Sequence, residues 1–300
     1  MGKEHYYHMF ANGDDAQNFI TCTEEFKAAF NRFALCHYLT RVDVLSMSVE
    51  DSHPHALLWG NFESCLKFKN LYEDLSMRCI IQRRGSKDGV ILNIDILEID
   101  DEQYLINTGT YTIAQATKDG KAIMPYDYLY GTGALYFRSP HTILPWLVDE
   151  AGQQMEPQRL GDLPVQKQRI ICGSRTCLPA EYLVCNGFIL PTNYVDIKHF
   201  ESIYRTHNCF RAFLASSKTR DEELLRRMAS VRGVIIEDLQ ARELCKEACM
   251  QLFGKQTTRQ LSIDSRIRLA QNLRKMYHMS YRQLSFLVKI PEPELRKYVK

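Results

Sequence analysis

The stretch VLSMSVEDSHPHALLW, residues 44–59, carries the pattern from which the fold of this chain is predicted. Its apolar residues alternate with small polar ones, stop at Glu50–Ser52, and resume in a second short run. Alternation with a period of two is typical of a half-buried strand, and a few polar residues between two such runs are typical of a turn. We therefore predict two strands, at 42–49 and 53–59, that are joined by a tight turn.

The segments on both sides of this stretch continue a succession of strands and helices. The elements expected, in chain order, are a strand at 5–10, a helix to about residue 38, the two strands above, a helix at 62–79, a strand at 90–99 and a helix at 101–117. Thr21 and Glu24 have the spacing of a capping box, which predicts the start of the first helix. Strand, helix, strand, strand, helix, strand is the order of the split βαβ, or ferredoxin-like, arrangement. Residues 1–138 are therefore predicted to form an α+β domain, an antiparallel sheet with helices on its faces.

Two further regions are expected after this domain. Turn-forming residues at 131–145 and a polar stretch at 150–168 predict a boundary. Beyond it we expect a middle region, 139–260, that is mainly helical from Lys198 onward and in which no motif can be interpreted. The segment 261–300 is clearer, because it contains three short helical patterns, at Ser265–Tyr277, Ser280–Val288 and Glu292–Val299. Short helices separated by turns of two or three residues are typical of a helix-turn-helix unit.

Basic residues are concentrated at the end of the chain. Residues 255–300 contain eleven Lys and Arg against three acidic residues, although the whole chain of 300 residues has a net charge of only +2. A basic tail on a mildly acidic body favours contact with a polyanion, and a solvated charged helix face is the alternative.

Other features of composition limit the class of protein. The longest apolar runs fall short of a membrane span, and the N-terminus lacks the apolar stretch of a signal peptide, so we expect a cytoplasmic protein with no membrane partner. Ten cysteines in such a protein are expected to be reduced and mostly buried, and a structural zinc site is the alternative.

His53 and His55 are the first candidate site. Residues two apart on a strand project from the same face, so the pair can offer two imidazole nitrogens to one divalent ion. With nine histidines in 300 residues, roughly 0.3 such pairs arise by chance, so a solvated or hydrogen-bonded pair is the alternative. Pro54 between them removes a backbone donor, which predicts a bulge or a missing neighbour strand at that position.

The helix that follows the last predicted strand supplies the candidate nucleophiles. Tyr104 and Tyr111 both lie on it, and Gln115 is four residues after Tyr111, hence on the same helical face. Covalent cleavage needs a side chain that can attack phosphorus, and a tyrosine hydroxyl is one of the groups that can. A half-buried helix tyrosine with no catalytic role is the alternative for either residue.

Both candidate sites lie in motifs that resemble one family. Residues 44–58 combine a strand, a turn, His-Pro-His and leucines, and are similar to the signature of the REP-associated tyrosine transposases, members of the HUH (His-hydrophobic-His) superfamily. Residues 111–120 (YTIAQATKDG), followed by PYDY at 125–128, resemble a second segment of that family, in which Asn or Gln follows a tyrosine by four residues. The resemblance covers residues 5–138 well and 265–300 loosely.

The resemblance implies an HUH nuclease domain and a role for each candidate residue. Tyr111 would be the nucleophile, with Tyr104 as the alternative, and His53, His55 and Gln115 would hold Mg²⁺ or Mn²⁺. Single-stranded DNA would be cleaved through a 5′-phosphotyrosine link and the strands then transferred. Two departures are that Pro54 stands where valine is usual and that Gln115-Ala116 replaces an Asn-Pro pair.

DNA would be held by basic side chains of the two end domains. The candidates for phosphate or base contacts are Arg83, Arg84, Lys118, Lys121, Arg282, Arg296 and Lys297. The resemblance implies single-stranded or hairpin DNA as the partner and a nucleoid-associated location, and it leaves a homodimer open.

Three other functions stay open at this point. The first is a catalytically inactive derivative that acts as a DNA-binding or regulatory protein. The second is a replication or conjugation initiator of the same superfamily. The third alternative is an interaction protein with a helix-turn-helix tail.

Overall fold

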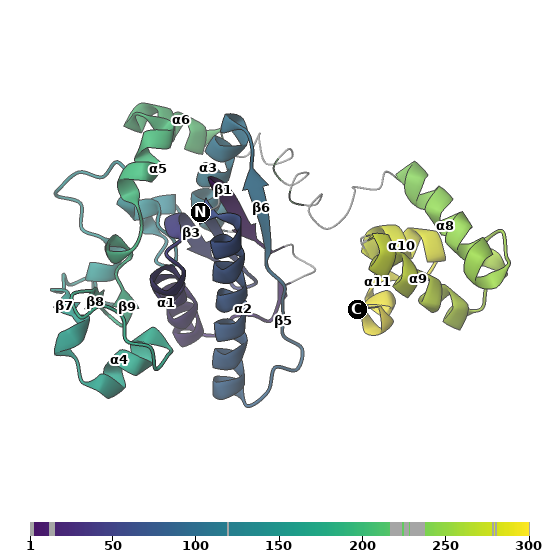
Figure 1. Ribbon diagram of the computed structural model, residues 1–300, viewed down its shortest axis with the longest axis horizontal. Coiled ribbons are helices and arrows are strands. Elements are labelled where there is room, and N and C mark those ends of the chain that lie inside the picture. Colours follow the sequence, from purple (N-terminus) through teal and green to yellow (C-terminus); the bar gives the residue numbers. More distant parts are fainter. Residues whose placement is uncertain are drawn as a thin grey trace. The chain divides into compact units, whose positions relative to one another are not determined.

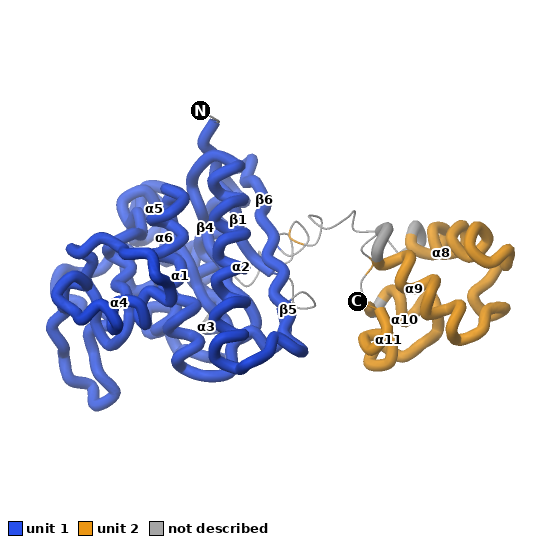
Figure 2. The backbone as a smooth tube through the Cα atoms, turned by 60° about the horizontal axis from the view of Figure 1, so that its bottom comes forward, with its two compact units in different colours: residues 1–224 blue, residues 225–300 orange. Residues whose placement is uncertain are grey.

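The computed structural model describes residues 3–11, 16–118, 120–216, 224, 228, 238–277, 279 and 281–299, without the side chains of residues 116, 118, 238–240, 275–277 and 282. The chain forms two compact units, residues 1–224 and 225–300 (Figure 2). The expected middle region, 139–260, is therefore not a unit of its own. Residues 139–224 belong to the first unit and residues 225–260 to the second.

The first unit is built on a four-stranded antiparallel sheet with the order β3-β4-β1-β6 (Figure 1). Its first elements are β1 (Glu4–Phe10), β2 (Ala16–Gln17), α1 (Thr23–Thr40), β3 (Asp43–Val49), β4 (Pro54–Asn61), α2 (Phe62–Arg84), β5 (Ile91–Leu92), β6 (Asp95–Ile99) and α3 (Glu102–Lys118). The predicted α+β class is confirmed. Two predicted boundaries are wrong, because α2 continues to Arg84 and the strand expected at 90–99 is divided into β5, which pairs with β2, and β6.

Helices cover both faces of this sheet. Helices α1 and α2 pack together on one face, and α3 packs against β3, β4 and β6 on the other. The α1/α2 face is apolar: its inward side chains include Phe33 and Phe68, which are fully buried. Burial of one such side chain contributes about 1.5–3 kcal/mol, so this face supplies much of the stability of the unit.

The start of α1 is stabilised by Glu25 and not by Glu24, so the predicted capping box is wrong. The backbone nitrogen and hydroxyl of Thr21 donate to Glu25 at 2.8 and 3.1 Å. Arg84 at the end of α2 donates to both carboxylate oxygens of Glu25, at 2.7 and 2.5 Å, and to the carbonyl oxygens of Asn18 and Phe19. Glu25 is buried, and this network ties α1 to α2.

The segment after α3 wraps around the sheet edge at β3. The hydroxyls of Tyr128 and Tyr136 donate to the carbonyl oxygens of Val49 and Leu45, at 2.6 and 2.5 Å. Val195 forms a bridge with Val44 on the same strand. Since an uncovered edge strand presents unpaired backbone groups, these contacts close it.

In the part of the middle region that belongs to the first unit, the described chain is mainly helical only from Ile197 onward, which agrees with the expectation of helices from Lys198. That part contains irregular chain, a three-stranded sheet and three short helices, namely β7 (Gln158–Arg159), α4 (Val165–Cys172), β8 (Leu183–Cys185), β9 (Phe188–Ile189), α5 (Ile197–Tyr204) and α6 (His207–Ala215). Helix α5 lies directly on α3, where the Tyr204 hydroxyl donates to the carbonyl of Ile106 at 2.8 Å. This approach requires Gly109, because a Cβ there would be 2.3 Å from the Tyr204 hydroxyl.

The second unit is a bundle of helices with its own core. Its helices are α8 (Asp238–Phe253), α9 (Ile263–Tyr277), α10 (Tyr281–Val288) and α11 (Glu292–Tyr298). The last three agree with the predicted helices, while Ser280, the expected cap of α10, lies outside the described residues. Leu269, Leu284 and Leu295 are fully buried where these helices meet.

Two further expectations concern the whole chain. All ten cysteines are free thiols, and six of them are buried. Within the described residues, no helix has both the length and the apolar character that a membrane crossing requires.

Candidate active site between the sheet and helix α3

Helix α3 presents a row of polar and aromatic side chains to the sheet. The helix begins where the Asp101 carboxylate accepts a hydrogen bond from the backbone nitrogen of Tyr104 at 2.6 Å. Tyr104, Thr108, Tyr111 and Gln115 follow at intervals of three or four residues, which places them on one helical face. The first three are buried, and Gln115 is half-buried.

Of the two predicted histidines, His53 directly precedes β4 and His55 is its second residue. Pro54 opens this strand and pairs with Val49 of β3, whereas the pairing of β4 with β1 begins only at Ala56. The proline therefore occupies a position with a neighbour strand on one side, as predicted. His53 and His55 lie with their ring centroids 4.6 Å apart, and the Ser52 hydroxyl is 2.7 Å from Nδ1 of His53.

The structure brings the predicted nucleophile and the predicted metal ligands together. The ring of Tyr111 is 5.3 Å from that of His55, edge to face. Nε2 of Gln115 is 3.3 Å from Nε2 of His55. The residues come from β4 and from the second half of α3, which are separated by more than fifty positions in the chain.

A third histidine, His8 of β1, completes the cluster and was not predicted. Its ring lies 5.9 Å from that of His55 and 6.1 Å from that of Tyr111, and its Nδ1 is 3.4 Å from the Tyr104 hydroxyl. Burial, together with the nearby His53, lowers the pKa of His8 to about 3, so this imidazole is neutral at physiological pH. The predicted first strand includes His8, but its pattern does not show which face His8 shares. In the structure His8 pairs with Leu57, which is two residues after His55 and therefore on the same face of the sheet.

This side of the sheet also contains buried polar atoms that lack a hydrogen-bond partner. Within the described part of the chain, these include Nε2 of His8, Oγ of Ser46 and Oγ1 of Thr108. Buried polar groups are normally hydrogen-bonded, and an unsatisfied one costs about 1–3 kcal/mol. The interface between the sheet and α3 therefore gives up stability to keep polar groups inside.

Lys121, a predicted DNA contact, lies beside this cluster in an ion-pair network. Its ammonium is 2.5 Å from Glu50 and 2.9 Å from Asp51, in the turn that precedes the histidines. Glu50 is buried, and it also accepts a hydrogen bond at 3.0 Å from Ser48, the residue opposite His55 on β3. Lys121 thus fixes the turn between β3 and β4.

The donor set of the cluster fits a divalent cation only with the help of a substrate. Among the residues that the structure describes, no group of three or more His, Cys, Asp or Glu side chains is arranged to hold a metal ion. A cation here would be held by the imidazoles of His53 and His55, the amide of Gln115 and substrate oxygens. The Gln115 amide points at Nε2 of His55 and can present its oxygen in place of its nitrogen.

The remaining predicted DNA contacts differ in whether their charged groups are exposed or already engaged by other residues. Arg83 and Lys297 are exposed, whereas the guanidinium of Arg84 is used in the Glu25 network. Arg296 pairs with Glu292 at 2.7 Å and stacks on the ring of Tyr281. The side chains of Lys118 and Arg282 lie outside the described part of the chain.

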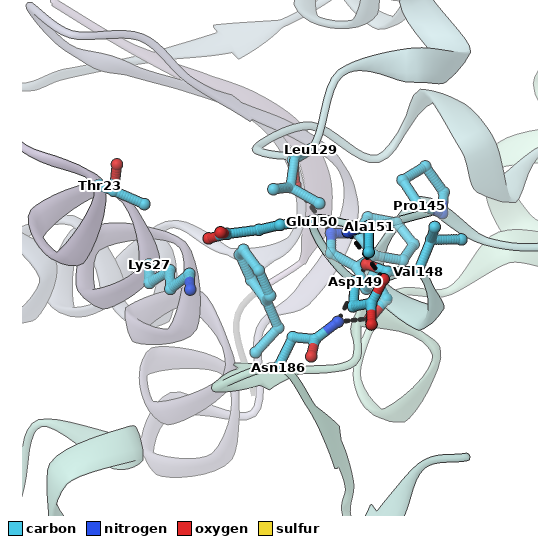
Figure 3. Close-up of a pocket in the computed structure, with 11 residues that line it drawn as sticks. Thr23, Lys27, Leu129, Pro145, Val148, Asp149, Glu150, Ala151 and Asn186 are labelled. Atoms are coloured by element: carbon cyan, nitrogen blue, oxygen red, sulfur yellow. Dashed lines mark hydrogen bonds between the residues drawn. The ribbon is translucent and has the colours of Figure 1, made fainter. Parts of the chain in front are cut away.

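Figure 3 shows a different cavity, of about 460 Å³, between α1 and the segment 145–151. Lys27 and Glu150 extend into it from different walls. Asn186 donates to the carbonyl oxygens of Trp146 and Val148, at 3.3 and 3.0 Å, so the polar groups of this wall hold the loop in place. None of the predicted site residues lines this cavity.

Comparison of this chain with family models, with curated proteins and with solved structures yields no match. The roles of the histidines and the tyrosine are therefore inferred from their positions and contacts.

Proposed function

We propose that this protein cleaves single-stranded DNA with Tyr111 and transfers the strand, in the manner of a REP-associated tyrosine transposase. One observation carries the proposal: Tyr111 and Gln115, one helical turn apart on α3, lie directly against His55 of the histidine pair. A nucleophile beside metal-ligating side chains is the arrangement that metal-assisted phosphoryl transfer requires.

The arrangement of the strands supports the same proposal. The order β3-β4-β1-β6, with α1 and α2 on one face, is the order expected of the ferredoxin-like sheet that the HUH resemblance implies. In the second unit, α10 and α11 are separated by a three-residue turn, the spacing of a helix-turn-helix. The exposed Lys297 of α11 is then the candidate for a phosphate contact.

The cleavage step is a transesterification. The phenol oxygen of Tyr111 forms a bond to the scissile phosphorus, and the bond from that phosphorus to the 3′ oxygen breaks. The phenol loses one proton and the departing oxygen gains one, so the products are a 5′-phosphotyrosine and a free 3′-hydroxyl. Since one phosphoester replaces another, a second 3′-hydroxyl can reverse the step and join strands without ATP.

His53, His55 and Gln115 would hold Mg²⁺ or Mn²⁺ in this reaction. When bound, the cation would supply charge stabilisation to the oxygens of the scissile phosphate. His8 has a different part, because its strongly lowered pKa makes it a poor base and its ring packs edge to face against that of Tyr111.

DNA would reach the site where β4 begins and α3 ends. Tyr111 is only 6% exposed, whereas His53 and Gln115 are half-buried and border the surface. The phosphate would therefore enter beside these two residues.

A covalent-adduct assay tests the proposal. The protein is incubated with hairpin-containing single strands and Mg²⁺ or Mn²⁺, and a protein–DNA adduct is sought by denaturing electrophoresis. We expect an adduct that Tyr111→Phe abolishes and that the matched variant Tyr104→Phe retains. An adduct that survives Tyr111→Phe and disappears with Tyr104→Phe would reassign the nucleophile.

The second candidate function is DNA binding without cleavage. It is favoured by the burial of Tyr111 and by the dependence of any cation site on a single amide besides the two imidazoles. In that case no adduct forms with any strand or cation, while DNA binding persists.

A further inference from the structure

A groove lies between α2 and the α4 segment of the first unit. Its volume is about 820 Å³, and it is lined by residues of α2, α1 and the α4 segment. Four arginines line it, namely Arg78 and Arg83 of α2 with Arg169 and Arg175 of the α4 segment. None of its lining residues is acidic.

The two walls of the groove come from segments that have basic residues only. Residues 75–87 contain four Lys and Arg, and residues 163–180 contain three, with no Asp or Glu in either segment. The chain as a whole has 36 acidic residues among 300, so their absence from both walls keeps the groove electropositive.

The guanidinium groups in this groove are available to a ligand. All four arginines are exposed, and within the described residues no ion pair or side-chain hydrogen bond engages them. Their neighbour Arg84 is the contrast, because it is neutralised by the buried Glu25. Gln82, Gln166 and Ser174 add neutral hydrogen-bond donors to the same walls.

The spacing of the arginines suits an extended chain of phosphates. Arg78 and Arg83 are five residues apart on a helix that rises about 1.5 Å per residue, hence about 7.5 Å apart along its axis. Both residues line the same groove, so one wall can contact more than one phosphate of a strand that runs along it. Arg169 and Arg175 form the facing wall.

A small phosphorylated molecule fits these observations less well. Small-molecule sites are mostly apolar and enclose most of their ligand. Here the four arginines are exposed along an open groove. An elongated polyanion can therefore contact all four, whereas a small ligand would contact fewer of them.

We propose that this groove binds the phosphate backbone of a nucleic acid, as a second contact surface on the sheet side opposite to the histidines. The identification of the polyanion as nucleic acid rests on the proposed function. Arg78, Arg83, Arg169 and Arg175 contact phosphates without reading sequence, and they extend the footprint of the protein beyond the cleavage site.

The salt dependence of binding tests this proposal in the full chain. The Tyr111→Phe protein, in EDTA, is titrated with a fluorescent single strand and with a duplex of equal length, at salt from about 50 to about 200 mM. The variant Arg78→Gln/Arg169→Gln/Arg175→Gln is expected to lower the slope of log Kd against log salt by about 1 per arginine removed, hence by about 3 on the preferred form. The two forms of DNA reveal whether the groove takes one strand or two.

Two further triple variants make the result specific. Lys67→Gln/Arg138→Gln/Lys198→Gln removes three exposed charges of the same unit outside the groove and should leave the slope near that of the parent. Arg78→Lys/Arg169→Lys/Arg175→Lys keeps the charge and should retain most of the slope. An unchanged slope in the groove variant, or an equal loss in the outside variant, overturns the proposal and points to an acidic or phosphorylated protein as the occupant.

Failure of this proposal is distinguishable from failure of the proposed function. The binding measurement needs neither cleavage nor a cation. If the groove variant lowers the salt slope but no adduct forms, the groove proposal is supported and the nuclease proposal is wrong. If the adduct forms and the groove variant leaves the salt slope unchanged, the proposed nuclease function is supported and the proposed groove contact is wrong.

Discussion

The two faces of the four-stranded sheet differ in what they bury. The α1/α2 face packs Phe33, Phe68 and Tyr72 against apolar residues of the strands, and all three are fully buried. The α3 face buries His8 and His55, and among the described residues it also buries Oγ of Ser46 and Oγ1 of Thr108 without a hydrogen-bond partner. The first face therefore supplies stability, and the second gives up stability for a cluster of groups that can do chemistry.

The two arginines at the end of α2 also have different environments. Arg84 completes a buried network and belongs to the framework, whereas Arg83, one residue earlier, faces the open groove. Adjacent residues of the same type thus have different uses, because neighbouring positions on a helix point in directions about 100° apart.

The largest expected effect is on stability, through the apolar face. Phe33→Ala removes a fully buried ring that contacts Phe68 and Tyr72, and it should lower the free energy of unfolding by about 3–5 kcal/mol. Leu39→Ala, at an exposed position of the same helix, should cost well under about 1 kcal/mol. Urea denaturation of both variants measures the difference. Similar unfolding midpoints for the two variants would show that this face does not supply most of the stability of the unit.

The next effect is on activity, through the polar face. His55→Ala should lower adduct formation by more than about 100-fold, because loss of a supporting contact alone costs 10–100-fold at metal sites. Because the ring of His55 is fully buried, its removal also leaves a cavity, so the free energy of unfolding of His55→Ala is measured alongside to separate loss of folding from loss of chemistry. His5→Ala, on the neighbouring strand and partly exposed, is the matched control and should leave the adduct unchanged. Full activity of His55→Ala would remove the histidine pair from the mechanism.

The Glu25–Arg84 network predicts a pH dependence of stability. The hydrogen bond from Arg84 lowers the pKa of Glu25 below its usual value, despite the opposing effect of burial. A carboxyl whose pKa is lowered in the folded state stabilises the protein above its unfolded pKa, near 4.3, and this contribution is lost as the pH falls through the lower folded value.

Glu25→Gln should therefore destabilise the protein by about 2 kcal/mol at pH 7, with a smaller difference from the parent as the pH falls below about 4. Urea midpoints between pH 3 and pH 7 measure this, and Glu24→Gln at the exposed neighbouring position is the control. A difference that stays constant with pH would contradict the assignment of the network to Glu25.

The smallest expected effect is a gain. Ser46→Ala removes a buried hydroxyl that has no hydrogen-bond partner among the described residues, so stability should rise by about 1 kcal/mol. Adduct formation should stay unchanged, since Ser46 lies beside Leu57 and not beside the histidines. A loss of stability would mean that this polar atom has a stabilising contact in solution, and the contrast between the faces would weaken.

The local elements of this protein could be predicted from its sequence alone. The alternation at 44–59 predicts two strands with His53 and His55 on one face, and helical spacing predicts that Tyr111 and Gln115 share a face. Both expectations agree with the structure, because the periods of a strand and a helix are local properties of the chain. The shift of the capping partner from Glu24 to Glu25 shows the limit, because that choice depends on Arg84 from another helix.

Tertiary structure decided which of these elements meet. His8 joined the cluster through the pairing of β1 with β4, and the basic groove arose where α2 and the α4 segment, about ninety residues apart in the chain, form facing walls. Neither can be predicted from periodicity, because strand register and helix packing depend on contacts between distant parts of the chain. Sequence therefore determined what each segment can present, and packing determined that histidines and tyrosine share one side of the sheet and the free arginines the other.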